Sequence, residues 1–570
     1  MSPSQPSAPA RALSTNGWDT VYAVYFPDLN KAIAAQKTSP ATITGTTTGD
    51  DGTYALAGTF GDWQLRAGGD GENVYLQLPI TSSTLTLTTE GATPSATLLG
   101  LVLVTIEVKL QWVAASPGTT RQNLTVSATS SAAAQPPVSI VDIDYGSNTP
   151  SLVEKGIYNA LAETWLVSNV GAFKQVFSTI VLDTTLDTDA NFQWTVPTST
   201  MYAVVDQTDA SGQPDAAHSV FAVLCMTEGR PSPGIHEVDP AIIPASDGTK
   251  TINSAFLISG ERFLTKLILP GLPLMFKGTP PLTSFLVSSD GLSVKSTVDL
   301  QLNDQQLDNG RTVNPTVPAG DFTLALTGAL VELTMNGLYF DYTAGTKVSI
   351  NHASTVSLTL NTGRQFKMDL VSSRNSATVS QSDGVYVALV VSNIAASIAA
   401  AAVGGLLSGV AETPVVAMQA GEAGAEGAAE AGVQLADLGN LPAGEEDGVG
   451  NFNEDADEAA NAAVQGQGAA FKTCLTAFWP ILRKGLVALA SAGVSSIPSA
   501  INFIIKHEAT KQGDISTLDD FGTQMLAPVS WPRQQPIAPG SSLSDNLVSG
   551  QLNGAFQVAL NLAFDHTPAA

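Results

Sequence analysis

The sequence predicts an α+β protein in which antiparallel sheets pack against a small number of amphipathic helices. Segments such as Val104–Trp112 alternate apolar and polar residues, as strands do when one face of a sheet is buried and the other is wet. Between such segments, Ser254–Phe276 is the clearest amphipathic stretch of helical period. Charged residues make up only 13% of the chain, and the Ser-, Thr- and Gly-rich remainder is typical of β proteins with many turns.

The composition limits the number of domains and the class of partner. The chain has 570 residues, too many for one hydrophobic core, and 44% of them are hydrophobic, which is enough to bury more than one. A net charge of −26 leaves no basic surface to neutralise phosphates, so we expect no nucleic-acid partner. Cys225 and Cys474 lie far apart in apolar sequence, which predicts two buried free thiols rather than a disulfide.

The N-terminus has no apolar segment of the kind that a secretory signal peptide requires. We therefore expect synthesis in the cytoplasm, and any release or secretion would need a non-classical route. Residues 1–14 are rich in Pro, Ser and Ala and are expected to be a disordered tail. Order is expected from Gly17, with a strand over Thr20–Phe26 and a short helix over Asp28–Ala34 that is entered at Pro27.

Strands and one helix follow in the first half of the chain. A helix is expected to open at Asn148-Thr149-Pro150, with apolar positions at every fourth residue. These positions are Val153, Ile157, Leu161 and Trp165. Gly- and Thr-rich turns separate the expected strands Tyr54–Arg66, Val74–Ile80 and Thr84–Thr89, and the alternating pattern returns over 298–302, 322–326, 331–335, 356–360, 366–370 and 558–564.

The stretch Ser254–Phe276 is expected to supply the helix of a second sheet-and-helix module. Ser259 is the expected N-cap, and Glu261 places negative charge at the helix N-terminus. Pro270 and Pro273 should end or kink the helix. An ordinary hydrophobic core is one interpretation of its apolar stripe. The alternative is that the stripe forms the wall of an apolar tube, with the candidate residues Phe263, Leu264, Leu267, Ile268 and Leu272.

Three later segments differ in composition from the rest. Residues 384–411 contain no charged residue and are long enough to span a bilayer, but their Ala and Gly content favours a buried strand and a packed helix. Residues 412–470 contain twelve acidic residues and no Lys or Arg, so we expect a flexible insert, with a partner-docking arm as the alternative. Residues 471–570 are expected to complete the modules, which otherwise cover 15–235 and 236–411.

The motifs of known catalytic and metal sites are absent or incomplete. None of the five histidines stands in an HExxH or two-His metal spacing, and His236–Asp239 is interpreted as a capping or surface motif. Asp187–Asn191 begins like an EF-hand loop but continues with Phe192 where Gly is needed and has Thr198 where Glu is needed. No Walker loop or nucleophile elbow occurs. We therefore predict no catalytic residue, no metal, no cofactor and no enzymatic activity.

Seven segments, in this order along the chain, carry a resemblance to a known family: Gly17–Ala23, Asn30–Ile33, Phe221–Met226, His236–Asp239, Ser254–Phe256, Phe263-Leu264 with Ile268–Pro270, and Pro528–Pro532. Together they resemble the clostridial P-47 protein family, which is related to the OrfX proteins and is encoded beside botulinum neurotoxin genes. The resemblance implies the tubular lipid-binding (TULIP) superfamily. The expected fold is then two TULIP-like modules, each a strongly curved antiparallel sheet wrapped around a long helix.

The resemblance also implies a function. The first hypothesis is a non-enzymatic lipid-binding or membrane-associating accessory protein of a toxin-like gene cluster, with acyl chains held between curved sheet and helix. Its expected partners are a lipid or membrane surface and other proteins of the same gene cluster. The alternative is a structural or interaction protein with a collapsed tube that assembles a toxin complex. Insertion of residues 384–411 into a membrane is a third hypothesis.

Overall fold

The structure is a computed structural model, and it divides the chain into two compact units. The first unit contains Leu13–Ser259, Asp519–Ser549 and Gln557–Ala570, and the second contains Met1–Ala12, Gly260–Leu518 and Gly550–Phe556. The predictions for 384–411, 412–470, 471–508, Asp187–Asn191 and Cys474 lie outside the described residues. The structure describes residues 11–49, 52–129, 136–182, 193–209, 211–246, 251–302, 305–306, 312–343, 346–360, 366–381, 528–534 and 546–565.

Strand β1 (Thr20–Tyr25) lies inside one sheet of the first unit, with a strand paired on each side. It pairs antiparallel with β13 (Pro214–Thr227) on one side and with β14 (Ser254–Ile258) on the other. The outer strand β12 (Pro197–Thr208) pairs with β13. Almost every residue of β1 and of the second half of β13 is buried, which fits the apolar runs Val21–Val24 and Val220–Met226 in these strands. Helix α1 (Phe26–Gln36) follows β1 without a loop and lies against β13.

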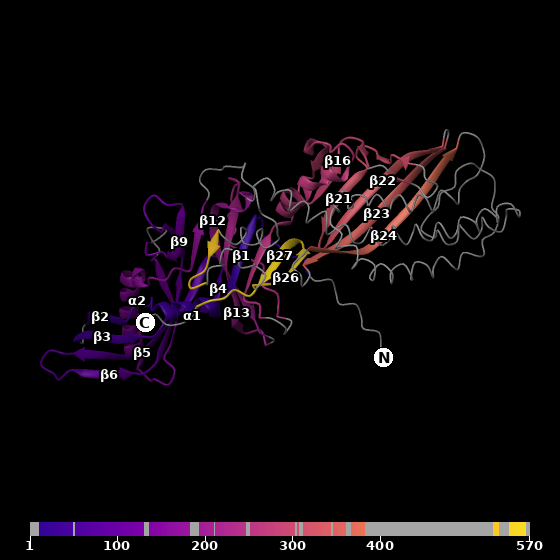
Figure 1. The fold of residues 1–570 in the computed structure, drawn as a ribbon. Coiled ribbons are helices and arrows are strands. Elements are labelled where there is room, and N and C mark those ends of the chain that lie inside the picture. The colour runs from indigo at the N-terminus through magenta and orange to yellow at the C-terminus, as the bar shows by residue number, and fades with distance from the viewer. Residues whose placement is uncertain are drawn as a thin grey trace, which may run out of the picture. The chain divides into compact units, whose positions relative to one another are not determined.

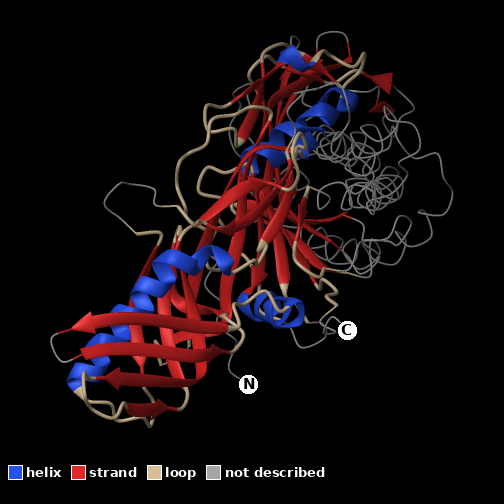
Figure 2. Ribbon diagram, turned by 90° about the vertical axis from the view of Figure 1, so that its left-hand side faces the viewer, coloured by secondary structure: helices blue, strands red, loops and turns tan. Residues whose placement is uncertain are grey.

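A second sheet of the first unit has the strand order β10-β7-β5-β3-β2, and β4 and β6 also pair with β5 (Figure 1). Helix α2 (Leu152–Asn169) covers one face of this sheet, as Figure 2 shows. The Tyr158 hydroxyl on α2 lies 3.4 Å from the Ser83 hydroxyl on β5. The strands are β2 (Thr42–Gly49), β3 (Gly52–Phe60), β4 (Gln64–Asp70), β5 (Asn73–Thr88), β6 (Ser95–Leu99), β7 (Val102–Val108) and β10 (Val138–Asp144).

A small third sheet joins segments from distant parts of the chain. Its order is β25-β11-β9-β8, and β25 brings residues 529–530 against β11. Two short 3-10 helices, η1 (Val170–Ala172) and η2 (Gln193–Thr195), lie in the connections. The strands are β8 (Leu110–Ala114), β9 (Arg121–Val126), β11 (Ser178–Val181) and β25 (Val529–Ser530).

The second unit is an antiparallel meander with the strand order β26-β23-β22-β21-β16-β15. β24 pairs with β23, β20 pairs with β17 and β22, and β18 pairs with β19. β26 and β27 each have residues in both units. The strands are β15 (Phe285–Val287), β16 (Ser293–Ser296), β17 (Leu300–Gln301), β18 (Gln305–Gln306), β19 (Thr312–Val313), β20 (Thr316–Val317), β21 (Phe322–Thr327), β22 (Leu330–Thr343), β23 (Thr346–Leu360), β24 (Phe366–Gln381), β26 (Leu547–Asn553) and β27 (Ala555–Leu560).

The stretch around Ser259 is helical, but only its first residues are α-helical. α3 (Gly260–Arg262) is followed by a π-helix, η3 (Phe263–Ile268), and a 3-10 helix, η4 (Leu269–Met275); the short 3-10 helix η5 (Leu282–Ser284) comes next. Pro270 accounts for the end of η3 and the change to η4, because proline lacks an N–H and its ring clashes with the carbonyl four residues earlier. The residues before Ser259 form strand β14.

Several predicted strands have different boundaries in the structure. The segment Val104–Trp112 was predicted as one strand, but at Lys109 the chain leaves β7 in one sheet and enters β8 in another. Residues 74–80 and 84–89 were predicted as two strands, but β5 runs through both. Conversely, Tyr54–Arg66 is divided between β3 and β4. Strand β27 ends at residue 560, short of the predicted 564. The alternation of apolar and polar side chains does not change where these strands begin and end. The pattern alone therefore could not locate the strand boundaries.

Helix α2 begins later and buries a different stripe than predicted. Its N-cap is Ser151, which forms a capping box with Glu154, rather than a residue of 148–150. Val153 is 62% exposed, whereas the buried positions are Tyr158, Leu161, Ala162 and Leu166. A repeat of four residues drifts around a helix of 3.6 residues per turn, so the predicted stripe could not stay on one face.

The end of the expected disordered tail contacts the rest of the first unit. Leu13 is buried, and the Ser14 amide donates to the Asp239 carboxylate over 3.1 Å. The α+β prediction itself is confirmed, since the paired strands described above are antiparallel and only a few helices accompany them.

Candidate functional site

The five residues predicted to line a tube all lie in η3 and η4 of the second unit. Each of them is at most 5% exposed. The Phe263 ring stacks on Phe556 of β27, with 4.8 Å between the ring centroids and 18° between the ring planes. One side of the stripe therefore packs against the protein's own aromatic side chain. The assignment of Phe263, Leu264, Leu267, Ile268 and Leu272 to a lipid-binding wall stays a prediction.

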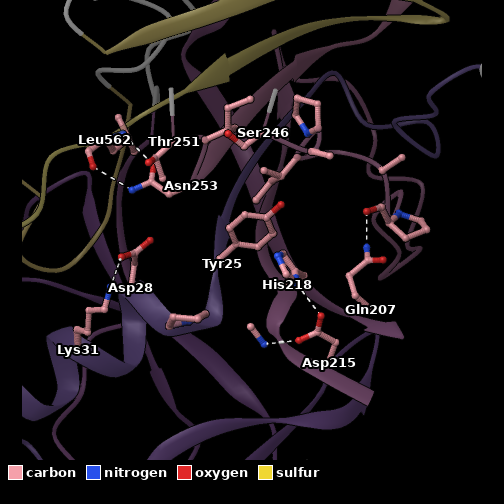
Figure 3. A pocket seen from close by; sticks show the side chains of 18 of the residues that line it. Tyr25, Asp28, Lys31, Gln207, Asp215, His218, Ser246, Thr251, Asn253 and Leu562 are labelled. Carbon is pink, nitrogen blue, oxygen red and sulfur yellow. Dashed lines mark hydrogen bonds and ion pairs between the residues drawn. The ribbon is translucent and has the colours of Figure 1, made fainter. Parts of the chain in front are cut away.

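A pocket of about 1000 Å³ opens in the first unit, where β1 passes directly into α1 (Figure 3). Tyr25 lies at this junction, and Asp28 and Lys31 follow on the first turns of α1. The opposite wall comes from β13 and from the segments 240–246 and 251–253. The apolar lining residues are Pro27, Ala217, Pro240, Ala241, Ile243, Pro244, Ala245, Ile252, Leu562 and Phe564.

Each of the two carboxylates of the pocket is paired with a nitrogen of a neighbouring side chain. Lys31 Nζ lies 3.4 Å from Asp28 Oδ1 on α1, and His218 Nδ1 lies 2.6 Å from Asp215 Oδ2 on β13. The carboxylates are the less exposed partners, at 11% and 26% of the side chain, against 57% and 63% for Lys31 and His218. The His218 ring also meets the edge of Tyr25 at 5.7 Å. The acidic groups therefore lie deeper than the basic groups, which lie towards solvent.

Backbone contacts hold the far side of the pocket in place. The Asn253 amide group donates to the Leu562 carbonyl over 3.0 Å, and the Leu562 N–H donates to the Asn253 side-chain oxygen over 2.8 Å. The Tyr25 N–H donates to the Asn253 carbonyl over 3.2 Å, and the Gln207 side chain donates to the Pro240 carbonyl. Segments far apart in sequence are thereby fixed around one opening.

The protonation states of the pocket follow from burial and hydrogen bonding. Burial raises the pKa of Tyr25, and the nearby Asp215 carboxylate raises it further, so the phenol is neutral at pH 7. The hydrogen bond from His218 lowers the pKa of Asp215, which is therefore ionised at neutral pH. These groups suit the binding of a polar head next to an apolar wall. They do not form a nucleophile activated by a base.

The other sites suggested by the sequence have structural roles. His236 Nδ1 lies 2.8 Å from the Tyr202 carbonyl, and Asp239 accepts hydrogen bonds from the Ser14 and Ala241 amides. Across the described residues, no group of three or more His, Cys, Asp or Glu side chains could hold a metal ion. In that same part of the chain, no helix is long and apolar enough to cross a membrane. Cys225 is a buried free thiol, as predicted.

Sequence reasoning did not find the pocket. It marked the β1–α1 junction as ordered, and Pro27 as the helix start, but gave no reason to join Asp28 to His218, which lies 190 residues later in the chain. A usable signal was the run Tyr25-Phe26-Pro27-Asp28, which places polar groups directly where a buried strand becomes a helix. The partners from β13 and from residues 240–253 required the tertiary structure.

Comparison with known proteins places the chain in a family. The family model "OrfX-like: Protein OrfX2/OrfX3/P47" matches residues 15–423. The OrfX3 protein of Paraclostridium bifermentans is 30% identical in an alignment of 295 residues that covers 47% of this chain and 56% of that protein. OrfX3 of Clostridium botulinum (strain Kyoto / Type A2) is 29% identical in an alignment of 290 residues that covers 46% of this chain and 55% of that protein. The chain thus matches little more than half the length of these curated relatives.

Two solved structures share the fold. P47 of Clostridium botulinum E1 superposes with a TM-score of 0.54 and 13% identity, over 96% of this chain and 99% of that one. P47 from Clostridium botulinum A2 gives a TM-score of 0.52 and 15% identity, over 69% and 88%. The resemblance inferred from seven short segments is confirmed, and so is the fold class, while the division into two TULIP-like modules stays a prediction. The chain belongs to the OrfX2/OrfX3/P47 family.

Proposed function

We propose that this chain is a non-enzymatic accessory protein of a toxin-like gene cluster that binds a lipid or another amphiphile. The proposal is supported by family membership, and one observation carries it: the pocket beside α1 joins an apolar wall to a set of paired polar groups. Ile243, Ile252 and Leu562 are buried apolar residues of this wall. A volume of about 1000 Å³ is at the upper end of small-molecule sites and suits a head group with part of its acyl chains.

The polar groups suit a head group that carries both signs of charge. Lys31 and His218 lie towards solvent, where they would meet an anionic group such as a phosphate. Asp28 and Asp215 lie deeper, where they would meet an ammonium or hydroxyl donor. Contact with a membrane surface through this opening would account for membrane association without a spanning helix.

Native mass spectrometry of the purified full chain and sedimentation with phosphatidylcholine vesicles test this function. Ala241→Trp fills the pocket from its wall, and Ala96→Trp places the same side chain at an exposed position on β6 as a control. We expect lipid binding by the wild type and by Ala96→Trp, and a loss of about tenfold or more in Ala241→Trp. If no lipid co-purifies and no vesicle binds, lipid binding is excluded.

The second candidate function is that of a structural or interaction protein with a collapsed tube. The stack of Phe263 on Phe556 favours it, because that stretch of the apolar stripe already packs against protein. The partners would then be other proteins of the same gene cluster. Size-exclusion chromatography of the chain with purified proteins encoded beside it tests this role, and a chain that stays uncomplexed with all of them would argue against it.

A further inference from the structure

Strand β2 forms one edge of the sheet that α2 covers (Figure 1). Its eight residues pair with β3 in one continuous register, from Thr42 opposite Thr59 to Gly49 opposite Gly52, with no bulge. In the described part of the chain, β3 is the one strand that pairs with β2. The other edge of β2 therefore presents backbone N–H and C=O groups over about 27 Å, the length of eight extended residues.

Proteins usually protect such edges with short strands, bulges, prolines or charges. The other edge strands of the first unit follow this rule. β10 has a register shift and two aspartates, β12 begins at Pro197 and has two register shifts, and β4 has a register shift and carries Arg66 and Asp70. β6, β8 and β25 are at most five residues long. Residues 42–49 include no charge, no proline and no bulge. Among the described residues, β2 is thus regular, neutral and unpaired on its outer edge.

The two faces of β2 differ in chemistry. Ile43 is 1% exposed on the face that α2 covers, and Gly45 on the same face lies close to Leu161 of α2. The opposite face carries Thr42, Thr44, Thr46 and Thr48, and all four are exposed. Their neighbours on this face of β3, β5 and β6 are also uncharged and unburied. These are Thr53, Ala55, Ala57, Thr59, Ser82, Thr84, Thr86, Thr88, Ala96 and Leu98.

We infer that β2 pairs antiparallel with β2 of a second copy of this chain, joining the two sheets edge to edge. The α2-covered faces of both sheets lie on the same side only when each residue of β2 pairs with a residue of the same face in the second copy. A slip of one residue would place Ile43 of one copy on the opposite side from Ile43 of the other. Around a two-fold axis, the central registers of this kind set Gly45 opposite its own copy, or Thr46 opposite its own copy.

Both registers make the edge complementary to itself. With Gly45 at the centre, Thr44 lies opposite Thr46 of the second copy and Thr42 opposite its Thr48. With Thr46 at the centre, Thr44 lies opposite Thr48. Within residues 42–49, every pair on the exposed face, which α2 does not cover, then joins threonine with threonine. Such cross-strand pairs are favourable. Each copy carries a net charge of −26, which opposes association, but this strand contributes none of it. An isologous contact of this kind needs no other surface.

Analytical ultracentrifugation of the full chain at concentrations up to about 100 µM tests the inference, since a weak dimer is still populated there. We expect a monomer–dimer equilibrium. Thr44→Lys/Thr46→Lys places lysine opposite lysine in either register and should raise the dimer Kd by about tenfold or more. The control Ala57→Lys/Thr59→Lys carries the same charges on the same face, one strand inwards, and should dimerise. If the control also dissociates, the faces pack together and edge pairing is wrong.

Cross-linking supplies an independent measurement. In Thr44→Cys/Thr46→Cys, a cysteine lies opposite a cysteine of the second copy in both registers, so mild oxidation should give a covalent dimer on a non-reducing gel. Thr59→Cys on β3 should remain monomeric. A wild-type chain that is monomeric at every concentration, together with no cross-linked dimer of the β2 variant, overturns the proposal. Because lipid binding is read from vesicles and mass spectra, its failure would be seen separately.

Discussion

The packing of Phe263 decides whether the apolar stripe of η3 is core or tube wall, and truncation of this side chain measures it. Phe263 is 1% exposed and stacks on Phe556 at 4.8 Å. Phe263→Ala should therefore cost about 3–5 kcal/mol of stability, the range for a phenylalanine removed from a packed core. Of this, about 0.5–1.5 kcal/mol should come from the aromatic pair and should disappear when Phe556 is also alanine.

Hydrogen–deuterium exchange of the β27 amides around Phe556 is the suitable assay, because a chain of two units has no single unfolding free energy. Leu286→Ala is the control, since Leu286 is 63% exposed in the same unit and its loss should change stability by no more than about 0.5 kcal/mol. A change below about 1 kcal/mol in Phe263→Ala would refute the packed interpretation, because a side chain that faces open space loses few contacts.

Three further results are expected. Asp19→Ala removes the two 2.9 Å hydrogen bonds that the buried carboxylate accepts from the Thr227 amide and hydroxyl. The protection of nearby amides against hydrogen exchange should therefore fall by about 3 kcal/mol or more. Unchanged protection would contradict a stabilising role for Asp19. The pKa of Asp215 is lowered in the folded state, so its hydrogen bond with His218 stabilises the fold at neutral pH. This stabilisation is lost as the pH falls below the ordinary carboxyl pKa of 3.8. In His218→Ala, the pKa of Asp215 measured by NMR titration should rise. Burial raises the pKa of Cys225 to about 12, so in a Cys474→Ser chain Ellman's reagent at pH 8 should label the Cys225 thiol only after unfolding. Labelling of that variant in its native state would show that the Cys225 thiol is accessible.

Local periodicity predicted that many segments are strands, because the alternation of side chains in a strand is a property of the chain itself. The apolar, polar order of Val104–Trp112 identified strand structure on both sides of Lys109, and Pro27 lies in the first turn of α1. The same pattern could not show that Lys109 is a crossing point between two sheets. Alternation continues on both sides of that residue, and sheet membership depends on which strands lie next to it.

The pocket illustrates the same limit at the level of the site. Asp28 and Lys31 could be paired from their spacing on a helix, since residues three apart face the same side. Their placement opposite His218 depends on the pairing of β1 with β13, which sets Tyr25 opposite Val220. No local signal in the sequence carries that information.

The sequence by itself determined that this chain is an α+β protein of antiparallel sheets and that it belongs to a family, because both follow from short segments whose pattern is written in neighbouring residues. Only the tertiary structure decided where the pocket lies, which face of α2 is buried and that β3 is the one described strand that pairs with β2. These properties depend on contacts between residues far apart in the chain. The physical reason is strand pairing, because the register between distant segments decides which side chains line the pocket, which face is buried and which strand lies at the edge of a sheet.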